Sequence, residues 1–366
     1  MQDRTARIDV AAISQNVARL RHLTGADHFI AVVKADGYGH GASTAARAAL
    51  AGGAEMVAVA DIEEATMLRD EGIRAPVLCW LHGSGETFRE AVHLDLDIGL
   101  SRLDQIHTIA RAAGSLGRRA RIHVKVDTGL SRNGFEPTQV AEAARRLTRV
   151  ADLVETVGVF THLSNTSPEA DAASLQLFDA AIAEVRAAGL TPEYLHAAAT
   201  AACLSPLGAR YGTVRVGLGI YGVLPAAVRS IERPGLRPAM TLAARVVAVR
   251  EAHPGVGVSY DHLWRADRRT RLALVPLGYA DGVPRAALNN AEVLIHGDRY
   301  PIVGRVAMDQ FVVDVGAGQV VVGDDVVLWG GSDPASPQIH EWADWSSSSP
   351  YELLVGVGRR VARIPA

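Results

Sequence analysis

Eight short apolar runs, separated by amphipathic stretches, lie between His28 and Val216. The runs predict strands at 28–33, 56–60, 76–80, 97–100, 120–126, 154–161, 194–196 and 213–216, and the stretches predict helices at 12–22, 41–52, 62–71, 103–113, 140–149 and 170–188. Strands that alternate with helices in this way indicate a parallel sheet. Eight such units match a (β/α)8 TIM-like barrel, although the count alone also fits a doubly wound open sheet.

The pattern changes after Pro225. Strand-like runs at 242–249, 271–276, 292–295, 310–315 and 319–328 follow one another with Gly, Asp and Pro turns and no helices between them. This pattern predicts a second, mostly β domain. A chain of 366 residues also exceeds what one hydrophobic core usually organises. We therefore expect a barrel domain at 1–234 and a C-terminal β domain at 235–366, with the boundary inside 228–238.

The composition narrows the class of partner. A net charge of −3, from 37 basic and 40 acidic residues, gives no attraction to nucleic acid or to an anionic membrane. The two cysteines, Cys79 and Cys203, cannot form a disulfide framework, and neither a signal peptide nor a membrane span is recognisable. The thirteen histidines lack the spacing of metal ligands. We expect a cytoplasmic protein that binds a small molecule and no metal.

One lysine stands where a barrel would place its active site. Lys34 follows the first predicted strand in the segment 31–41, AVVKADGYGHG, and opens a glycine-rich turn. Active sites of such barrels form at the carboxyl ends of the strands. A solvated lysine beside a turn is the simpler interpretation. A lysine that is partly desolvated can instead lose its proton and form a Schiff base with an aldehyde cofactor.

The segment 31–41 resembles the signature of the alanine racemase family, and the resemblance extends over essentially the whole chain. The resemblance implies a homodimer that uses pyridoxal 5′-phosphate to interconvert L-alanine and D-alanine, supplying D-alanine for peptidoglycan. Lys34 would carry the cofactor, and the hydroxyl of Tyr38 would help to bind its phosphate.

A second segment, 214–222 (VRVGLGIYG), contains the pattern G-x-G-x-x-G. A dinucleotide site is the obvious interpretation, but Pro225 interrupts the helix that should follow, and no acidic residue stands about 20 residues further on. The family resemblance implies instead that the amides of Gly217 and Leu218 bind the phosphate and that Arg215 faces the pyridine nitrogen. A guanidinium only donates, so that nitrogen would stay unprotonated, which favours racemisation over transamination. The alternative for Arg215 is a surface ion pair.

Racemisation needs a proton acceptor on each face of the reacting carbon. Lys34 would serve one face, and the resemblance implies that Tyr260, in the segment 258–260, serves the other face from the partner subunit. Tyrosine has an ordinary pKa of about 10, so it needs help to act as a base. In the family that help comes through His162 and Arg215. A tyrosine without such a motif is more often a core or interface residue.

Further residues match parts of the family's substrate site. Arg132, in the segment 126–135, would bind the substrate carboxylate, for which guanidinium geometry is well suited. Lys125 matches a lysine that is carbamylated in many members and orients that arginine, although an ordinary strand lysine is an equal alternative.

The β domain would complete the partner's pocket. The resemblance implies that the Met308 amide contacts the substrate carboxylate, that Arg305 lies at the access channel, and that Tyr351 contacts the phosphate and narrows the entrance together with Tyr260. Such a pocket should admit a methyl side chain and reject larger ones at about 1 to 3 kcal/mol per methylene.

Two positions depart from the family pattern. Ala199 and Thr200 stand where the family usually has Asn-Ser, so we expect the Thr200 hydroxyl to bind the phosphate, with Ser205 as the nearby alternative. Ala307 replaces a frequent cysteine, which leaves the range of substrates open.

Three other functions compete with an alanine racemase. A racemase of broader range, acting on serine for example, differs only in the pocket. A pyridoxal phosphate-dependent decarboxylase would have a longer glycine-rich loop and an acidic residue where Arg215 stands. A non-catalytic carrier of the cofactor would have no use for the β domain that holds Tyr260, Met308 and Tyr351.

Overall fold

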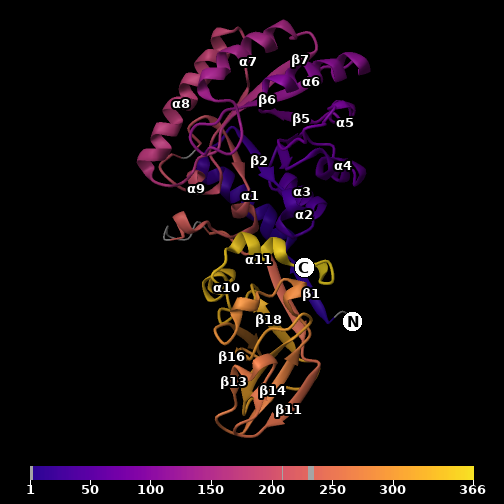
Figure 1. The fold of residues 1–366 in the computed structure, drawn as a ribbon, viewed down its shortest axis with the longest axis vertical. Helices are drawn as coiled ribbons and strands as arrows, with labels where there is room; N and C mark the ends of the chain where they lie inside the picture. The colour runs from indigo at the N-terminus through magenta and orange to yellow at the C-terminus, as the bar shows by residue number, and fades with distance from the viewer. Residues whose placement is uncertain (1–2, 208, 230–234) are drawn as a thin grey trace. The chain divides into compact units, whose positions relative to one another are not determined.

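The computed structural model describes residues 3–207, 209–229 and 235–366. The chain divides into two compact units (Figure 1). One unit contains Ile13–Gly37 and Ala42–Leu236, and we call it the barrel unit. The other contains Met1–Ala12, Tyr38–Gly41 and Arg237–Ala366, and we call it the β unit.

The barrel unit is built on a closed parallel barrel of eight strands. Its strands, in order, are β2 (His28–Val32), β3 (Met56–Val59), β4 (Val77–Cys79), β5 (Asp97–Leu100), β6 (Ala120–Lys125), β7 (Val154–Phe160), β8 (Tyr194–His196) and β9 (Gly212–Val216). Closure is visible at Ile30 of β2, which pairs with Met56 on one side and with Arg215 on the other. The predicted (β/α)8 barrel is therefore confirmed, the open sheet is excluded, and each predicted strand ends within one residue of the observed one.

Helices cover the outside of the barrel, as α6, α7 and α8 show in Figure 1. The helices are α1 (Val10–Thr24), α2 (Lys34–Tyr38), α3 (Ala42–Ala51), α4 (Ile62–Asp70), α5 (Arg89–His93), α6 (Leu103–Leu116), α7 (Pro137–Arg149), α8 (Pro168–Ala187) and α9 (Thr200–Cys203). Their starts follow ordinary capping chemistry: Asp61 accepts a bond from the Glu64 amide, and Ser167 accepts one from the Ala170 amide. All six predicted helices are confirmed, whereas the short α5 and α9 were not predicted. The segment labelled α2 has left-handed φ angles at Ala35, Asp36 and Gly37 and is the turn expected after Lys34.

The β unit contains a nine-stranded sheet in the order β11-β14-β17-β16-β15-β18-β10-β1-β19. These strands are β1 (Arg4–Ile8), β10 (Met240–Arg245), β11 (Ala248–Ala252), β14 (Thr270–Val275), β15 (Glu292–Ile295), β16 (Asp298–Val303), β17 (Phe311–Gly316), β18 (Asp325–Trp329) and β19 (Ala362–Pro365). A separate ribbon pairs β12 (Gly257–Val258) with β13 (Trp264–Arg265), and two helices, α10 (Ile339–Ser346) and α11 (Pro350–Gly356), complete the unit. The predicted mostly β domain is confirmed.

For two predicted strands of this unit, the predicted residue ranges were wrong. The run 242–249 is split between β10 and β11, because β10 pairs with β18 and β11 pairs with β14, at separate places in the sheet. The run 319–328 is a strand only from Asp325 onward. Before it, the amide of Val321 donates to the Asp324 carboxylate at 2.7 Å and closes a turn.

The first strand of the chain belongs to the β unit. β1 lies between β10, to which it is antiparallel, and β19, to which it is parallel. The short loop Tyr38–Gly41 also belongs there, because a Cβ on Gly39 would lie 2.2 Å from the Leu354 carbonyl oxygen. The expected boundary at 234/235 did not foresee either segment, and it falls beside residues 230–234, which lie outside the described part of the chain.

We expect Ile8→Ala to destabilise the β unit, because the Ile8 side chain is fully buried in β1. Truncation of a buried isoleucine costs about 2 to 5 kcal/mol. Ile364→Ala, in the adjacent strand β19, is the matched control, because that side chain is 39% exposed. Equilibrium denaturation in urea measures both losses, and equal losses would contradict the burial of Ile8 in β1, between β10 and β19.

Candidate active site

Several cationic side chains gather in the barrel unit around Lys34. The pKa of Lys34 is lowered first by burial and then by the positive charges of Arg132 and Arg215. Burial, followed by the same two arginines, also lowers the pKa of Lys125, to about 8. Both arginines therefore lie within electrostatic reach of both lysines. Such a group of cations fits an anionic ligand.

Lys34 is followed by a left-handed turn. Ala35, Asp36 and Gly37 have φ angles of 51°, 52° and 63°. A left-handed conformation costs a residue with a side chain about 1 to 2 kcal/mol, so a run of this kind needs support. The support comes from three hydrogen bonds: Gly37 N to Val33 O at 2.8 Å, Ala35 N to Glu64 Oε1 at 2.7 Å, and Ala42 N to Asp36 Oδ1 at 2.9 Å.

Glu64, on α4, was not singled out in the sequence. Its second carboxylate oxygen accepts a bond from the Ala60 amide at 2.8 Å, so one side chain ties the end of β2 to the end of β3. Its negative charge raises the pKa of Lys34 and opposes the effect of burial. Glu64 therefore sets both the position and the electrostatic surroundings of the lysine.

Arg215, on β9, is buried to 4% exposure, which contradicts the surface ion pair considered for it. Its guanidinium donates to His196 Nδ1 at 2.7 Å, to His162 Nδ1 at 3.0 Å and to the Thr161 carbonyl at 3.0 Å. The ring of Phe160 lies 5.4 Å from its central carbon. The structure thus joins the predicted residues Arg215 and His162.

The protonation state of His162 follows from this contact. Because a guanidinium only donates, His162 Nδ1 must accept, and a neutral ring then carries its proton on Nε2. Burial is the largest cause that lowers the pKa of His162, to about 3, and the charges of Arg215 and Arg132 add to it. His162 is therefore neutral at physiological pH and has an N–H left to donate.

The turn after β9 meets α9 at Thr200. Thr200 is buried, and its hydroxyl accepts a bond from the Gly219 amide at 3.1 Å. A Cβ on Gly219 would lie 2.8 Å from the Thr200 side chain, so only glycine allows this approach. Ser205 is engaged elsewhere, since its hydroxyl donates to the Ala202 carbonyl at 2.9 Å. Thr200 therefore contacts the turn that holds the predicted Gly217 and Leu218.

A dinucleotide site at this turn is contradicted by the structure. Strand β9 leads into a single turn of 3-10 helix, Leu218–Tyr221, where a nucleotide-binding motif would begin a full helix.

The β unit brings the two predicted phosphate tyrosines together. The rings of Tyr38 and Tyr351 have their centroids 6.3 Å apart and are tilted by 45°. Tyr38 is buried and Tyr351 is 40% exposed, while desolvation still raises the pKa of Tyr351.

Tyr260 is 69% exposed but sits on a firmly anchored loop of the β unit. Its neighbours Ser259 and Asp261 have positive φ angles of 58° and 62°. The Ser259 hydroxyl donates to the Arg305 carbonyl at 2.7 Å, and the Arg305 side chain pairs with Asp261 at 2.7 Å. The predicted Tyr260 and Arg305 are thus neighbours, and the tyrosine ring is presented to solvent.

Met308 is also exposed, at 53%, on a fixed segment of the same unit. Its carbonyl accepts a bond from the Ala280 amide at 3.0 Å. Arg360 pairs with the adjacent Asp309 at 2.7 Å and with the fully buried Asp281 at 2.9 Å. Arg360 and Asp281 were missed in the sequence, because nothing local marks an ion pair between distant segments.

Two family models match the chain: alanine racemase, N-terminal domain, over residues 8–225, and alanine racemase, C-terminal domain, over residues 239–365. The chain belongs to the alanine racemase family. It is 46% identical to the alanine racemase of Thermobifida fusca over 98% of this chain and 97% of that one.

Solved structures agree with this membership. The alanine racemase of the D-cycloserine producer Streptomyces lavendulae superimposes with a TM-score of 0.96 at 37% identity, covering 100% of this chain and 97% of that one. The Corynebacterium glutamicum alanine racemase gives a TM-score of 0.87 at 31% identity, covering 100% of both chains. The chain is thus a member of an isomerase family with a barrel and a β domain.

The described residues contain no helix that is both long and apolar enough to cross a membrane. Within the same residues, no three His, Cys, Asp or Glu side chains come together in an arrangement that could hold a metal ion.

We expect Glu64→Gln to lower the pKa of Lys34 further, because the substitution removes the negative charge that raises it. The pH dependence of Lys34 acylation in cofactor-free protein, followed by peptide mass spectrometry, measures this shift. Glu63→Gln is the control, since Glu63 is an exposed neighbour on the same helix. An unchanged or raised Lys34 pKa in Glu64→Gln would show that Glu64 does not act on the lysine.

Proposed function

We propose that this chain is a pyridoxal phosphate-dependent racemase of alanine that works as a homodimer by a two-base mechanism. The buried Arg215 carries the proposal, because it is a permanent cation held by neutral acceptors where a pyridine nitrogen would meet a donor. A decarboxylase of the same cofactor class would need an acidic residue at that point. Racemases of broader range, including serine racemases, remain the closest alternative.

The residues fit the cofactor in their chemistry. An aldehyde combines with an unprotonated amine, and Lys34 has a lowered pKa. A phosphate needs several donors, and the Thr200 hydroxyl lies beside the turn that offers the amides of Gly217 and Leu218. The hydroxyls of Tyr38 and Tyr351 would complete the phosphate site. When bound, pyridoxal phosphate withdraws electrons and so acidifies the Cα–H of the substrate.

Lys34 takes up or returns the Cα proton on one face, and Tyr260 of a second copy does so on the other. His162 supports the tyrosine, because its Nε2–H can donate to a phenolate oxygen. The positive charge of Arg215, which donates to His162 Nδ1, also favours the phenolate. Arg132 binds the substrate carboxylate, with the Met308 amide of the second copy as an additional donor. Arg305, paired with Asp261, lines the access channel.

A second copy of the chain is needed because residues 235–366 would complete a neighbouring site. The β unit exposes large apolar side chains that an interface would cover: Tyr260, Leu263, Tyr279 and Met308. We further propose that the enzyme is cytoplasmic, which is supported by two buried free cysteines, Cys79 and Cys203. Its proposed role there is to supply D-alanine for the cell wall.

Lys125 would carry a carbamate in the working enzyme. It is buried, its pKa is lowered to about 8, and it faces the charges of Arg132, Arg215 and Lys34. An amine with this pKa is partly unprotonated near neutral pH, and its nitrogen can form a bond to the carbon of carbon dioxide while one N–H proton is released to solvent. The product is an anion, which would replace repulsion from the surrounding cations with attraction and would orient Arg132.

We expect Tyr260→Phe to keep cofactor binding and to lose racemisation by about 100- to 10,000-fold, the usual contribution of a general acid–base group. Circular dichroism of alanine and incorporation of solvent deuterium at Cα measure the loss for each enantiomer. Lys34→Ala should abolish the visible absorbance of the bound cofactor. A fully active Tyr260→Phe protein, or an active monomer, would refute the shared two-base site.

The carbamate predicts a carbonyl resonance in carbon-13 NMR of protein equilibrated with labelled bicarbonate. The resonance should disappear in Lys125→Ala and persist in Lys34→Ala. Its absence from the wild-type protein would leave Lys125 as an ordinary buried amine.

A further inference from the structure

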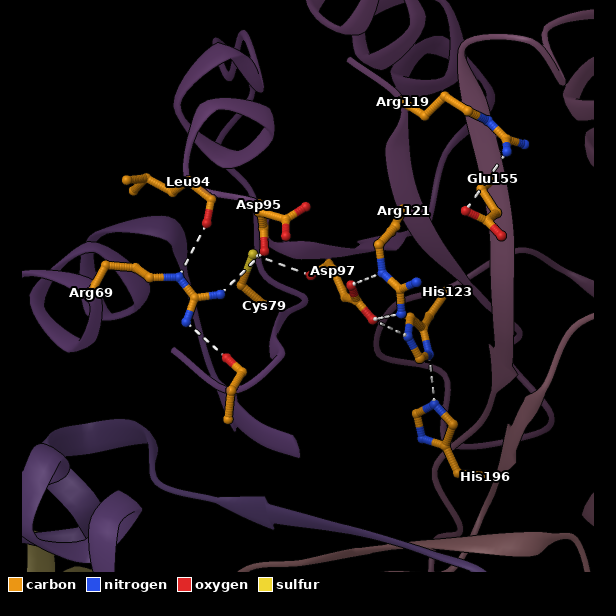
Figure 2. Close-up of polar contacts among 11 residues, drawn as sticks. Arg69, Cys79, Leu94, Asp95, Asp97, Arg119, Arg121, His123, Glu155 and His196 are labelled. Atoms are coloured by element: carbon orange, nitrogen blue, oxygen red, sulfur yellow. Dashed lines mark hydrogen bonds and ion pairs between the residues drawn. The ribbon is translucent and has the colours of Figure 1, made fainter. Parts of the chain in front are cut away.

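A line of hydrogen bonds runs through the inside of the barrel and ends on Arg215. The guanidinium contacts His196 Nδ1 at 2.7 Å, His196 Nε2 contacts His123 Nδ1 at 3.0 Å, and His123 Nε2 contacts Asp97 Oδ2 at 3.1 Å. Figure 2 shows the last two contacts. All four side chains are buried to 4% exposure or less.

The line connects the two ends of the barrel. Asp97 is the first residue of β5, His123 lies within β6, and His196 is the last residue of β8. Since the strands are parallel, the line starts at the edge opposite the catalytic one and reaches the edge where Arg215 and Lys34 lie.

The protons along this line can be assigned by elimination. Arg215 can only donate, so His196 Nδ1 accepts and the His196 proton lies on Nε2. That proton points at His123 Nδ1, which must therefore accept as well. The His123 proton then lies on Nε2 and is donated to the Asp97 carboxylate. Both histidines are neutral, and every bond of the line points from Arg215 toward Asp97.

We propose that Asp97, His123 and His196 are positioning residues that fix the Arg215 guanidinium through this one-directional chain of hydrogen bonds. This inference adds positioning residues to the proposed active site. The effect on catalysis that it predicts rests on the proposed function. The three residues touch neither substrate nor cofactor in this scheme. They hold the Arg215 guanidinium, which would donate to the pyridine nitrogen. The His196 ring that contacts this guanidinium is uncharged.

The Asp97 carboxylate, at the far end of the hydrogen-bond chain, is held in its anionic form. Arg121 donates to the other oxygen of Asp97 at 2.7 Å. Burial raises the pKa of Asp97, but the hydrogen bonds that His123 and Arg121 donate to the carboxylate, together with the charge of Arg121, outweigh burial and leave the pKa below its ordinary value. Burial and then the charge of Arg215 hold the pKa of His196 well below the usual range, in agreement with a neutral ring.

A glycine on the neighbouring strand leaves room for the His123 ring. Gly158, on β7, pairs with His123 across the sheet, and a Cβ there would lie 2.1 Å from His123 Nδ1. A side chain at this position would therefore displace the ring and break the bond to His196. Gly114 offers a matched control, because a Cβ there meets only Leu153 side-chain atoms, at 3.7 Å or more.

Nitrogen-15 NMR of the histidine rings in the cofactor-free, full-length protein tests the assignment directly. We expect His123 and His196 each to show a protonated Nε2 and an unprotonated Nδ1, and the Arg215 Nη protons to exchange slowly with solvent. A proton on Nδ1 of either ring, or a doubly protonated ring, would overturn the proposal. The measurement needs no variant and no activity.

Asp97→Asn and Gly158→Ala test the positioning role. The asparagine amide offers a single oxygen, so either His123 or Arg121 would face its NH2 group, and we expect mixed tautomers and faster exchange at Arg215. In the loaded enzyme kcat should fall about ten-fold or more with little change in KM, because misplacing a group by 1 Å can cost about 100-fold. Gly114→Ala should match the wild type.

These outcomes separate the two proposals. Unchanged tautomers and Arg215 exchange in both variants, or changed tautomers with unchanged kcat, would refute the positioning role while leaving the racemase proposal intact. A wild-type protein that shows the assigned tautomers but no racemisation would refute the proposed function and leave the hydrogen-bond chain standing.

Discussion

A buried cation held by neutral acceptors is the constraint on which the barrel interior depends. Moving a charge out of water costs several kcal/mol, so Arg215 is tolerable only because acceptors meet its donors. Two neutral histidines and a backbone carbonyl serve as such acceptors, and aromatic rings pack beside them. Because these three acceptors carry no charge, they leave the positive field of the guanidinium available to a ligand. The same field accounts for part of the lowered pKa values of Lys34, Lys125 and His162.

The backbone around the two proposed bases, Lys34 and Tyr260, is held in a fixed conformation. Lys34 begins a left-handed turn that Glu64 and Asp36 stabilise, and Tyr260 stands between two residues of positive φ that are tied to Arg305. Unfavourable backbone conformations persist only where surrounding contacts over-determine them. In both loops these contacts are made by the residues around the proposed base and not by the side chain of the base itself.

Much of this could be predicted from the sequence, because the barrel strands and helices carry their own periodic patterns. Lys34 and Arg215 were identified since each lies in a short motif beside a strand end. Glu64, Asp97 and His123 could not be identified in this way, because their roles come from contacts between elements that are separated in the sequence. Strand β1 was missed for the same reason: five residues with no marked alternation become a strand only through their neighbours on both sides.

The place of β1 has a consequence for how the chain is made. Strand β1 precedes the barrel in the chain, whereas both of its partners, β10 and β19, follow the barrel. The barrel can close during translation, since all its strands lie within His28–Val216, and at that stage β1 has neither partner. Synthesis of β10, and not closure of the barrel, therefore sets the earliest moment at which β1 can begin its native pairing.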